Sequence, residues 1–166
     1  MKSQYRYYVL GMLTLTSMLS IADRLIMSIL LEDIKLEFSM SDTQLGLLAG
    51  LAFTLFYALL GIPIARLADR WNRKNIVGIA LIVWSGMTAL CGAATGFISL
   101  FLARLGVGVG EAGGSPPSYS MIADYFKPEE LARAMGIFTI GAVLGTGGGL
   151  MVGGYLAESL GWRFTF

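Results

Sequence analysis

The stretch FISLFLARLGVGVGEAGGSPPSYSMIADYF, residues 97–126, says most about the fold. It is long and apolar enough to cross a bilayer, yet it contains Arg104 and Glu111, which are seven residues apart and therefore near one helical face. Charged groups inside a span are costly, so they favour a transport pathway over the alternative, a structural ion pair or packing seam. The glycines around them are Gly106, Gly108, Gly110, Gly113 and Gly114.

The composition is that of a membrane protein. Of the 166 residues, 55% are hydrophobic and only 14% are charged, which excludes an ordinary soluble domain. The net charge of +1 gives no electrostatic case for binding nucleic acid. The chain has no histidine, and its single cysteine, Cys91, excludes an intrachain disulfide. We therefore expect no cofactor and no metal ion, and any proton chemistry must fall to carboxylates.

Five apolar segments are long enough to span a bilayer. A cleaved signal peptide is an alternative for the first, since Ser20-Ile21-Ala22 resembles a cleavage site, but the apolar sequence that continues beyond it favours a membrane helix. A sixth span begins at about residue 162, where the chain stops, so we expect a fragment of an all-α integral membrane protein. The predicted spans are 7–31, 44–65, 75–94, 97–121 and 134–157.

Two patterns indicate how the spans pack. Glycines recur every four residues in the fifth span and form a flat stripe, against which another helix must pack closely. In the fourth span, Pro116 and Pro117 should loosen or kink the helix toward its end. The stripe consists of Gly141, Gly145, Gly149 and Gly153.

The charges of the connecting loops predict the orientation. Basic residues gather near the amino terminus, in residues 66–74, and at Lys127 and Arg133, which all fall on one side of the membrane. The alternate connections are acidic or nearly neutral. Because basic loops stay inside, we expect a multi-pass protein with a cytoplasmic amino terminus.

In this orientation three charged residues lie at depths that matter for transport. Asp23 and Arg104 are both about 10–12 Å from the outer surface, so they can meet as a pair. Glu111 lies about 10 Å deeper, near the bilayer midplane, where transporters place substrate and ion sites.

Two enzyme motifs can be set aside. Residues 108–113, GVGEAG, satisfy the glycine pattern of dinucleotide-binding sites, but no strand precedes them and no strand-helix unit surrounds them. No nucleophile elbow is present, and without histidine no serine can be activated in a triad. We therefore expect that the protein is not an enzyme.

The loop at residues 66–74, RLADRWNRK, resembles the signature loop of the major facilitator superfamily, G-x-L-A-D-R-x-G-R-K. Two glycines of that pattern are replaced, by Ala65 and Asn72. Asparagine can adopt the left-handed conformation that glycine would supply, so the replacement at Asn72 is mild. The alternative is a simple basic cluster that holds this loop inside the cell.

The resemblance extends over nearly the whole chain. The Asp23-Arg24 pair, the sequence GVGVGEAGGSPP at residues 106–117, and the Gly161-Trp162-Arg163 start are similar to the Spinster-type branch of that superfamily. The resemblance implies the amino-terminal six-helix bundle of a twelve-helix transporter in a bacterial inner membrane, with the carboxy-terminal bundle absent here. Spinster-type relatives are associated with lysophospholipids and sphingoid phosphates, which implies an amphipathic lipid substrate.

The same resemblance implies roles for two sets of charged residues. One set latches the cytoplasmic side in the outward-open state, and the other lines the substrate cavity between the two bundles. The gate set is Asp69, Arg70 and Arg73, and the cavity set is Asp23, Arg24, Arg104 and Glu111.

We expect alternating access with protonation of an intramembrane carboxylate as the coupling step. Asp23 is the first choice, because a carboxylate separated from Arg104 and desolvated prefers its proton. Glu111 is either a proton carrier itself or a site for a cationic group of the substrate, and Arg24 and Arg104 can hold a phosphate or carboxylate. Two alternatives stay open: an organic anion, sugar acid or drug as the substrate, and a non-transporting helical module in which the charges only lock helices together.

Overall fold

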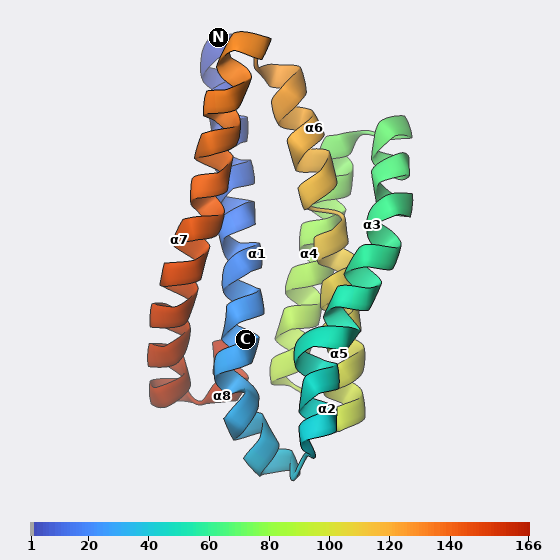
Figure 1. Cartoon of the computed structure of the whole chain (residues 1–166), viewed down its shortest axis with the longest axis vertical. Helices are drawn as coiled ribbons and strands as arrows, with labels where there is room; N and C mark the ends of the chain where they lie inside the picture. The colour runs from blue at the N-terminus through green and yellow to red at the C-terminus, as the bar shows by residue number, and fades with distance from the viewer. Residues whose placement is uncertain (1) are drawn as a thin grey trace.

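The computed structural model describes residues 2–166, apart from the side chains of residues 2, 3 and 52. This part of the chain consists of helices joined by short connections and contains no strand. Figure 1 shows the long helices running along one common axis. Five helical segments are long and apolar enough to cross a membrane, which confirms the prediction of an all-α membrane fold.

Four of the five membrane-length helical segments are longer than the predicted spans, and the third, Arg73–Gly92, has the same length as its predicted span. A π-helical turn, Leu47–Leu51, joins α2 to α3 in one continuous segment. The 37 residues of α1 extend about 55 Å, well beyond the roughly 30 Å of a hydrocarbon core, so its polar ends reach outside the predicted span 7–31. The helices are α1 (Lys2–Phe38), α2 (Asp42–Gly46), α3 (Ala52–Arg70), α4 (Arg73–Gly92), α5 (Phe97–Ala112), α6 (Ser115–Tyr125), α7 (Pro128–Leu160) and α8 (Trp162–Thr165).

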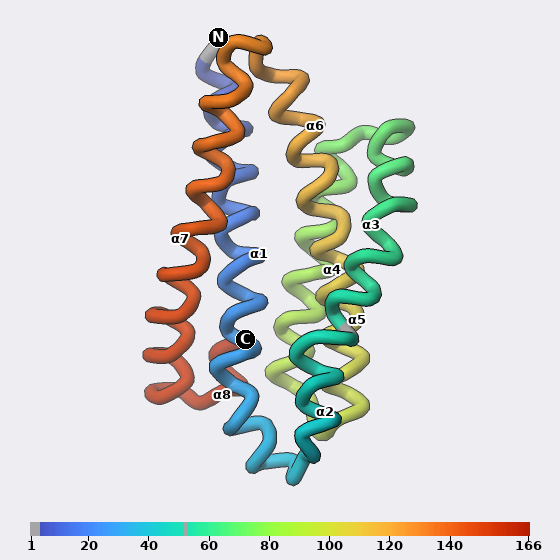
Figure 2. Tube along the Cα trace, viewed as in Figure 1, coloured from blue at the N-terminus to red at the C-terminus, as the bar shows by residue number. Residues whose placement is uncertain are grey.

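The helices form two groups. In Figure 1, α1 and α7 lie side by side, and α3, α4, α5 and α6 form the second group. The first turns of α1 lie beside the beginning of α7 (Figure 2), where Arg6 Nη1 donates to Glu130 Oε2 at 2.6 Å. At the opposite end, Arg163 of α8 pairs with Glu37 of α1 and donates to the Ala94 carbonyl oxygen at 2.6 Å. The first contact joins α1 to α7 within one group, and Arg163 links that group to the end of α4 in the other.

The helix that packs on the glycine stripe is α1. A Cβ atom added to Gly145 would lie 2.2 Å from the Met18 carbonyl oxygen, and one added to Gly141 would lie 2.4 Å from the Thr14 carbonyl oxygen. Both distances are shorter than real Cβ contacts, so only glycine allows this approach of the two backbones. Along the stripe, the nearest residues of α1 are Thr14, Met18, Ala22 and Ile26.

The stripe can be tested with two glycines of the same helix. Gly145→Ala is expected to lower the free energy of unfolding by about 1–3 kcal/mol, because the added methyl group overlaps the α1 backbone. Gly147→Ala is the control, since nothing lies within 4 Å of a Cβ there, and the higher helix propensity of alanine makes it neutral or stabilising. Thermal unfolding of the intact protein in detergent measures both. Equal midpoints for the two variants would contradict the packing.

The fourth span is broken near its middle. The Gly113 N–H donates to the Gly110 carbonyl oxygen at 3.0 Å, three residues back instead of four. Pro116 and Pro117 have no N–H, so the α-helical hydrogen bonds that their positions would donate are missing. The kink expected from these prolines therefore lies just before them, between α5 and α6.

Alternate glycines of α5 face different neighbours. A Cβ atom on Gly110 would lie 2.6 Å from the Trp84 backbone nitrogen in α4, and one on Gly108 would lie 3.1 Å from the Phe53 carbonyl oxygen in α3. The pattern that resembles a nucleotide-binding motif thus lets α5 pack closely between two helices.

Candidate functional site

Asp23 of α1 and Arg104 of α5 form an ion pair in the interior of the bundle. Arg104 Nη1 donates to Asp23 Oδ2 at 3.2 Å, and only 7% of Asp23 and 1% of Arg104 is exposed. The hydroxyl of Thr88 in α4 donates to the other oxygen, Asp23 Oδ1, at 3.1 Å. Counting residues from the helix ends had placed Asp23 and Arg104 at the same predicted depth in the membrane. The structure brings these two residues together. Removing either charge would leave the other buried without a partner.

Arg24 and Glu111 form a second ion pair between the same two helices. Glu111 Oε2 accepts from Arg24 Nε at 2.7 Å and lies 2.6 Å from Nη2. Adjacent helical residues differ in direction by about 100°, so Asp23 and Arg24 reach different partners on α5. The sequence predicted few partners for Glu111 and did not indicate this pair, because helix rotation decides which neighbour an arginine reaches.

Two aromatic rings of α3 lie beside Arg24, and the sequence reasoning missed them. The Arg24 guanidinium carbon is 4.7 Å from the centroid of the Phe53 ring and 4.8 Å from that of Tyr57. The two rings are stacked with centroids 5.6 Å apart. The sequence signal for this pair is the four-residue spacing of Phe53 and Tyr57, which places two rings on one helical face. In the structure both rings follow directly after the π-helical turn.

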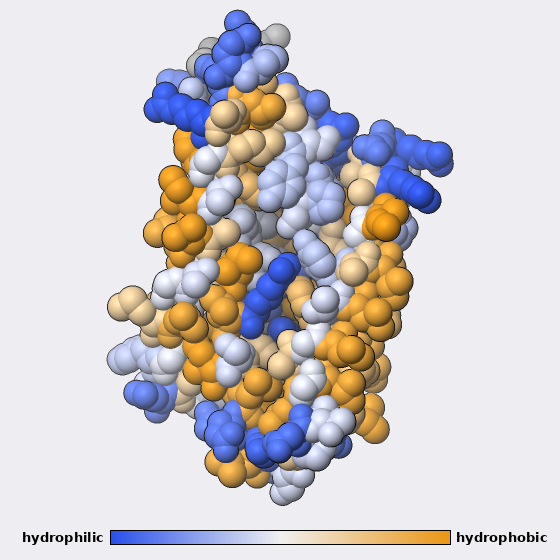
Figure 3. All heavy atoms as spheres, viewed as in Figure 1, coloured by the Kyte–Doolittle hydropathy of each residue, from blue (hydrophilic) through white to orange (hydrophobic). Residues whose placement is uncertain are grey.

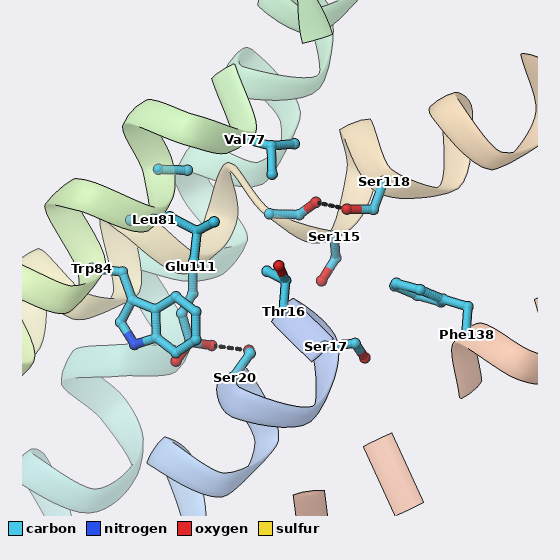
Figure 4. A pocket seen from close by; sticks show the side chains of 13 residues that line it. Thr16, Ser17, Ser20, Val77, Leu81, Trp84, Glu111, Ser115, Ser118 and Phe138 are labelled. Carbon is cyan, nitrogen blue, oxygen red and sulfur yellow. Dashed lines mark hydrogen bonds between the residues drawn. The ribbon is translucent and has the colours of Figure 1, made fainter. Parts of the chain in front are cut away.

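Glu111 also borders a small, partly open pocket of about 20 Å³, which has room for one water molecule. Figure 4 shows Ser20 on α1 directed at Glu111, and its hydroxyl donates to Glu111 Oε2 at 2.7 Å. The other carboxylate oxygen, Oε1, is buried and has no hydrogen-bond partner among the described residues. The hydroxyl groups lining the pocket are those of Thr16, Ser17, Ser20, Ser115 and Ser118.

Arg24 is the member of the second pair that reaches the surface. Its side chain is 31% exposed, whereas that of Glu111 is fully buried. Figure 3 shows hydrophilic atoms in the middle of the face viewed in Figure 1, between two columns of apolar atoms. A charged group in the middle of an apolar membrane face suits the wall of a cavity better than contact with lipid.

The predicted gate residues lie where α3 ends and α4 begins. Arg73 pairs with Asp124 at the end of α6, a residue that the sequence reasoning did not assign to the gate. Asp69, Arg73 and Asp124 line one open hollow of about 360 Å³, and Arg70 is not among its lining residues. Within the described part of the chain, neither Asp69 nor Arg70 forms an ion pair.

Asn72 does not use the left-handed conformation that is open to asparagine. Its φ of −68° and ψ of 108° are extended values, and it is the N-cap of α4. The Asn72 side-chain oxygen accepts from the Lys74 backbone N–H at 3.1 Å. Asparagine is favoured at such a cap because its side chain satisfies a free helical N–H, so it replaces the signature glycine through a hydrogen bond.

Comparison with known proteins decides the family. Residues 12–166 match the family model described as Major Facilitator Superfamily. The chain belongs to the Major Facilitator Superfamily. Within this superfamily it is similar to a bacterial homolog of the human lysosomal transporter Spinster, solved in an inward-facing and occupied conformation. The TM-score is 0.90 at 48% identity, over 96% of this chain and 34% of that one, which confirms the predicted Spinster-type resemblance.

Curated major facilitator relatives are also similar to this chain. An MFS-type efflux pump of Mycolicibacterium smegmatis is 39% identical over 156 residues, which cover 94% of this chain and 36% of the relative. A probable L-galactonate transporter of Escherichia coli is 28% identical over 155 residues, which cover 93% and 34%. The chain therefore spans about a third of the length of these relatives, and both names are those of transporters rather than enzymes.

Proposed function

We propose that the chain forms the amino-terminal bundle of a secondary active transporter that moves an amphipathic lipid, of the lysophospholipid or sphingoid type. Transport proceeds by alternating access in a bacterial inner membrane, with the amino terminus in the cytoplasm and protons as the coupling ion. The carboxy-terminal half of the same transporter supplies the opposite wall of the substrate cavity.

The two ion pairs between α1 and α5 carry this proposal. Ionisable groups inside a membrane protein are costly, and transporters concentrate them where substrates and ions bind. The Asp23–Arg104 pair is almost completely buried, while the second pair presents a partly exposed cation, Arg24. An ion pair that only holds two helices together does not need an exposed cation. A substrate site, in contrast, needs a charged group that the ligand can reach.

Asp23 is the proposed proton carrier, with Glu111 as a second one. Protonation of Asp23 cancels the negative charge that holds Arg104, so it would loosen α1 from α5. A bundle whose internal contacts depend on a proton can couple its rocking motion to the proton gradient.

The proposed lipid substrate is the one that the Spinster-type resemblance of the sequence implies, and the likeness to the Spinster homolog supports that resemblance. A sugar acid is the second candidate, which the similarity to a probable L-galactonate transporter favours. Arg24 suits either class, because a guanidinium forms paired hydrogen bonds with phosphate and with carboxylate.

Uptake by the intact protein in liposomes separates these candidates. An imposed proton gradient is expected to drive accumulation of labelled lysophospholipid and not of labelled galactonate. Uptake of galactonate without uptake of lysophospholipid would mean that the substrate is a sugar acid and not a lipid. Lipid uptake that ignores the gradient would remove the proton coupling, and no movement of either compound would favour a non-transporting module.

The gate can be tested through the Arg73–Asp124 pair. Arg73→Gln is expected to slow uptake on the order of 10-fold, the effect of about 1.4 kcal/mol on a rate-limiting step. Stability should change by less than about 1 kcal/mol, because exposed ion pairs contribute little. Lys74→Gln serves as a control for the loss of one neighbouring charge. The exchange Arg73→Asp with Asp124→Arg is expected to restore uptake, and failure of this exchange together with normal uptake in Arg73→Gln would exclude the gate role.

A further inference from the structure

We propose that two aromatic rings of α3 and the Glu111 carboxylate form a binding site for an organic ammonium group. The rings are those of Phe53 and Tyr57, and in this structure the guanidinium of Arg24 occupies the site. We base this on the proposed transport function, since the site would lie on the substrate route. The substrate would then be an amphiphile whose headgroup carries both an ammonium and an anionic group.

The two rings present one continuous aromatic surface to a cation. They are four residues apart on α3, with planes inclined by only 20° and centroids 5.6 Å apart. The Arg24 guanidinium carbon lies within 4.8 Å of both centroids, which is inside the range of cation–π attraction. Since the attraction comes from the ring quadrupole, it does not require a guanidinium, and an ammonium group at the same place is attracted as well.

Glu111 supplies the negative charge of the site. Its side chain is fully buried, and Arg24 is the cation that pairs with it. Only Oε2 is engaged in hydrogen bonds, by Arg24 and by Ser20, so Oε1 has no partner in the described part of the chain. Aromatic faces combined with a carboxylate form the environment in which proteins recognise quaternary ammonium ligands.

Arg24 is suited to leave this site when a substrate arrives. Its side chain is 31% exposed, and its guanidinium binds phosphate or carboxylate with paired hydrogen bonds. An anionic substrate group that attracts Arg24 would leave Glu111 buried and unpaired, which is strongly unfavourable. An ammonium group on the same molecule would take the vacated place. A zwitterionic headgroup therefore satisfies both charges, and a purely anionic one does not.

Phe53 is held in place before any ligand binds. Only 7% of it is exposed, and its backbone packs against Gly108, where an added Cβ would lie 3.1 Å from the Phe53 carbonyl oxygen. The Arg104 guanidinium carbon also lies 5.7 Å from the centroid of its ring. A ring fixed in this way offers a preorganised wall, so little ordering is needed when a cation binds.

Emptying the site tests the proposal directly. In the intact protein in detergent, Arg24→Ala is expected to bind labelled tetramethylammonium at least 10-fold more tightly than the native protein does, with potassium chloride at equal ionic strength as the control. Adding Phe53→Leu to Arg24→Ala is expected to abolish this binding. Adding Phe56→Leu, which removes a ring of the same helix that contacts no guanidinium among the described residues, is expected to preserve it. If Arg24→Ala does not fold, Arg24→Gln replaces it in the same assay.

Headgroup selectivity is the second measurement. In liposomes, Phe53→Leu is expected to weaken the apparent affinity for lysophosphatidylcholine about 5- to 30-fold, the equivalent of about 1–2 kcal/mol. For lysophosphatidylglycerol with the same acyl chain, which lacks the ammonium group, the change should stay below about 3-fold.

Two outcomes would overturn the ammonium site: equal losses for both lipids, or tetramethylammonium binding that persists in the Arg24→Ala protein when Phe53→Leu is added. If the native protein transports neither lipid while the tetramethylammonium results hold, the proposed lipid transport fails and the ammonium site stands.

Discussion

Asp23→Asn is expected to lower proton-gradient-driven uptake by at least about 100-fold, which corresponds to about 2.7 kcal/mol in the rate-limiting step. Asparagine has nearly the same shape but cannot take up or release a proton in the coupling cycle, and it cannot hold Arg104 by charge. Initial uptake rates in liposomes, with and without the gradient, measure the effect. The residual uptake of the variant should be independent of the gradient.

A double variant separates the loss of coupling from the loss of folding. Asp23→Asn alone leaves Arg104 buried without a counter-charge, which costs about 3–5 kcal/mol of stability. Asp23→Asn combined with Arg104→Gln removes both charges and is expected to recover most of that stability, because an uncharged pair needs no compensation. Uptake should nevertheless stay uncoupled. Gradient-driven uptake in the double variant would show that Asp23 is not the proton carrier.

Arg24→Gln is expected to destabilise the protein by about 3–5 kcal/mol, and Glu111→Gln by only about 1–2 kcal/mol. The difference arises from what each substitution leaves behind. Without Arg24, the fully buried Glu111 carboxylate loses its ion-pair partner. Without Glu111, Arg24 keeps its contact with two aromatic rings and is partly exposed, so water can solvate it.

Chemical unfolding of the two variants in detergent, at one pH, measures this asymmetry. Both variants should also lose most of their uptake, because the substrate site needs both charges. Equal losses of stability would contradict the asymmetry expected from the buried Glu111 carboxylate and the partly exposed Arg24. Unchanged uptake in Glu111→Gln would remove this residue from the transport route.

The sequence was sufficient to predict the membrane class, the interruption of the fourth helix by its prolines and the close approach at the glycine stripe. Each depends on properties of one segment: mean hydropathy, the missing N–H of Pro116 and Pro117, and the four-residue spacing of glycines. The Asp23–Arg104 pair was also accessible, because counting residues from the helix ends places both at one depth.

The sequence did not predict which residues of different helices contact one another. The glycine stripe did not reveal that α1 is the helix packed on it. Arg24 was assigned to the same cavity as Glu111 but not paired with it, and Phe53 and Tyr57 were not connected with either residue. Asp124 was likewise not connected with Arg73. Depth alone could not distinguish these partners, because several helices offer residues at the same level.

The sequence by itself determined that the chain has several segments able to span a membrane, and where along each of them the charged side chains lie. Those properties follow from the order of residues along one helix. Only the tertiary structure decided that Arg24 pairs with Glu111 beside two aromatic rings while Asp23 pairs with Arg104. The rotation of each helix about its axis and its crossing with its neighbours determine such contacts, and both depend on the packing of all the helices at once.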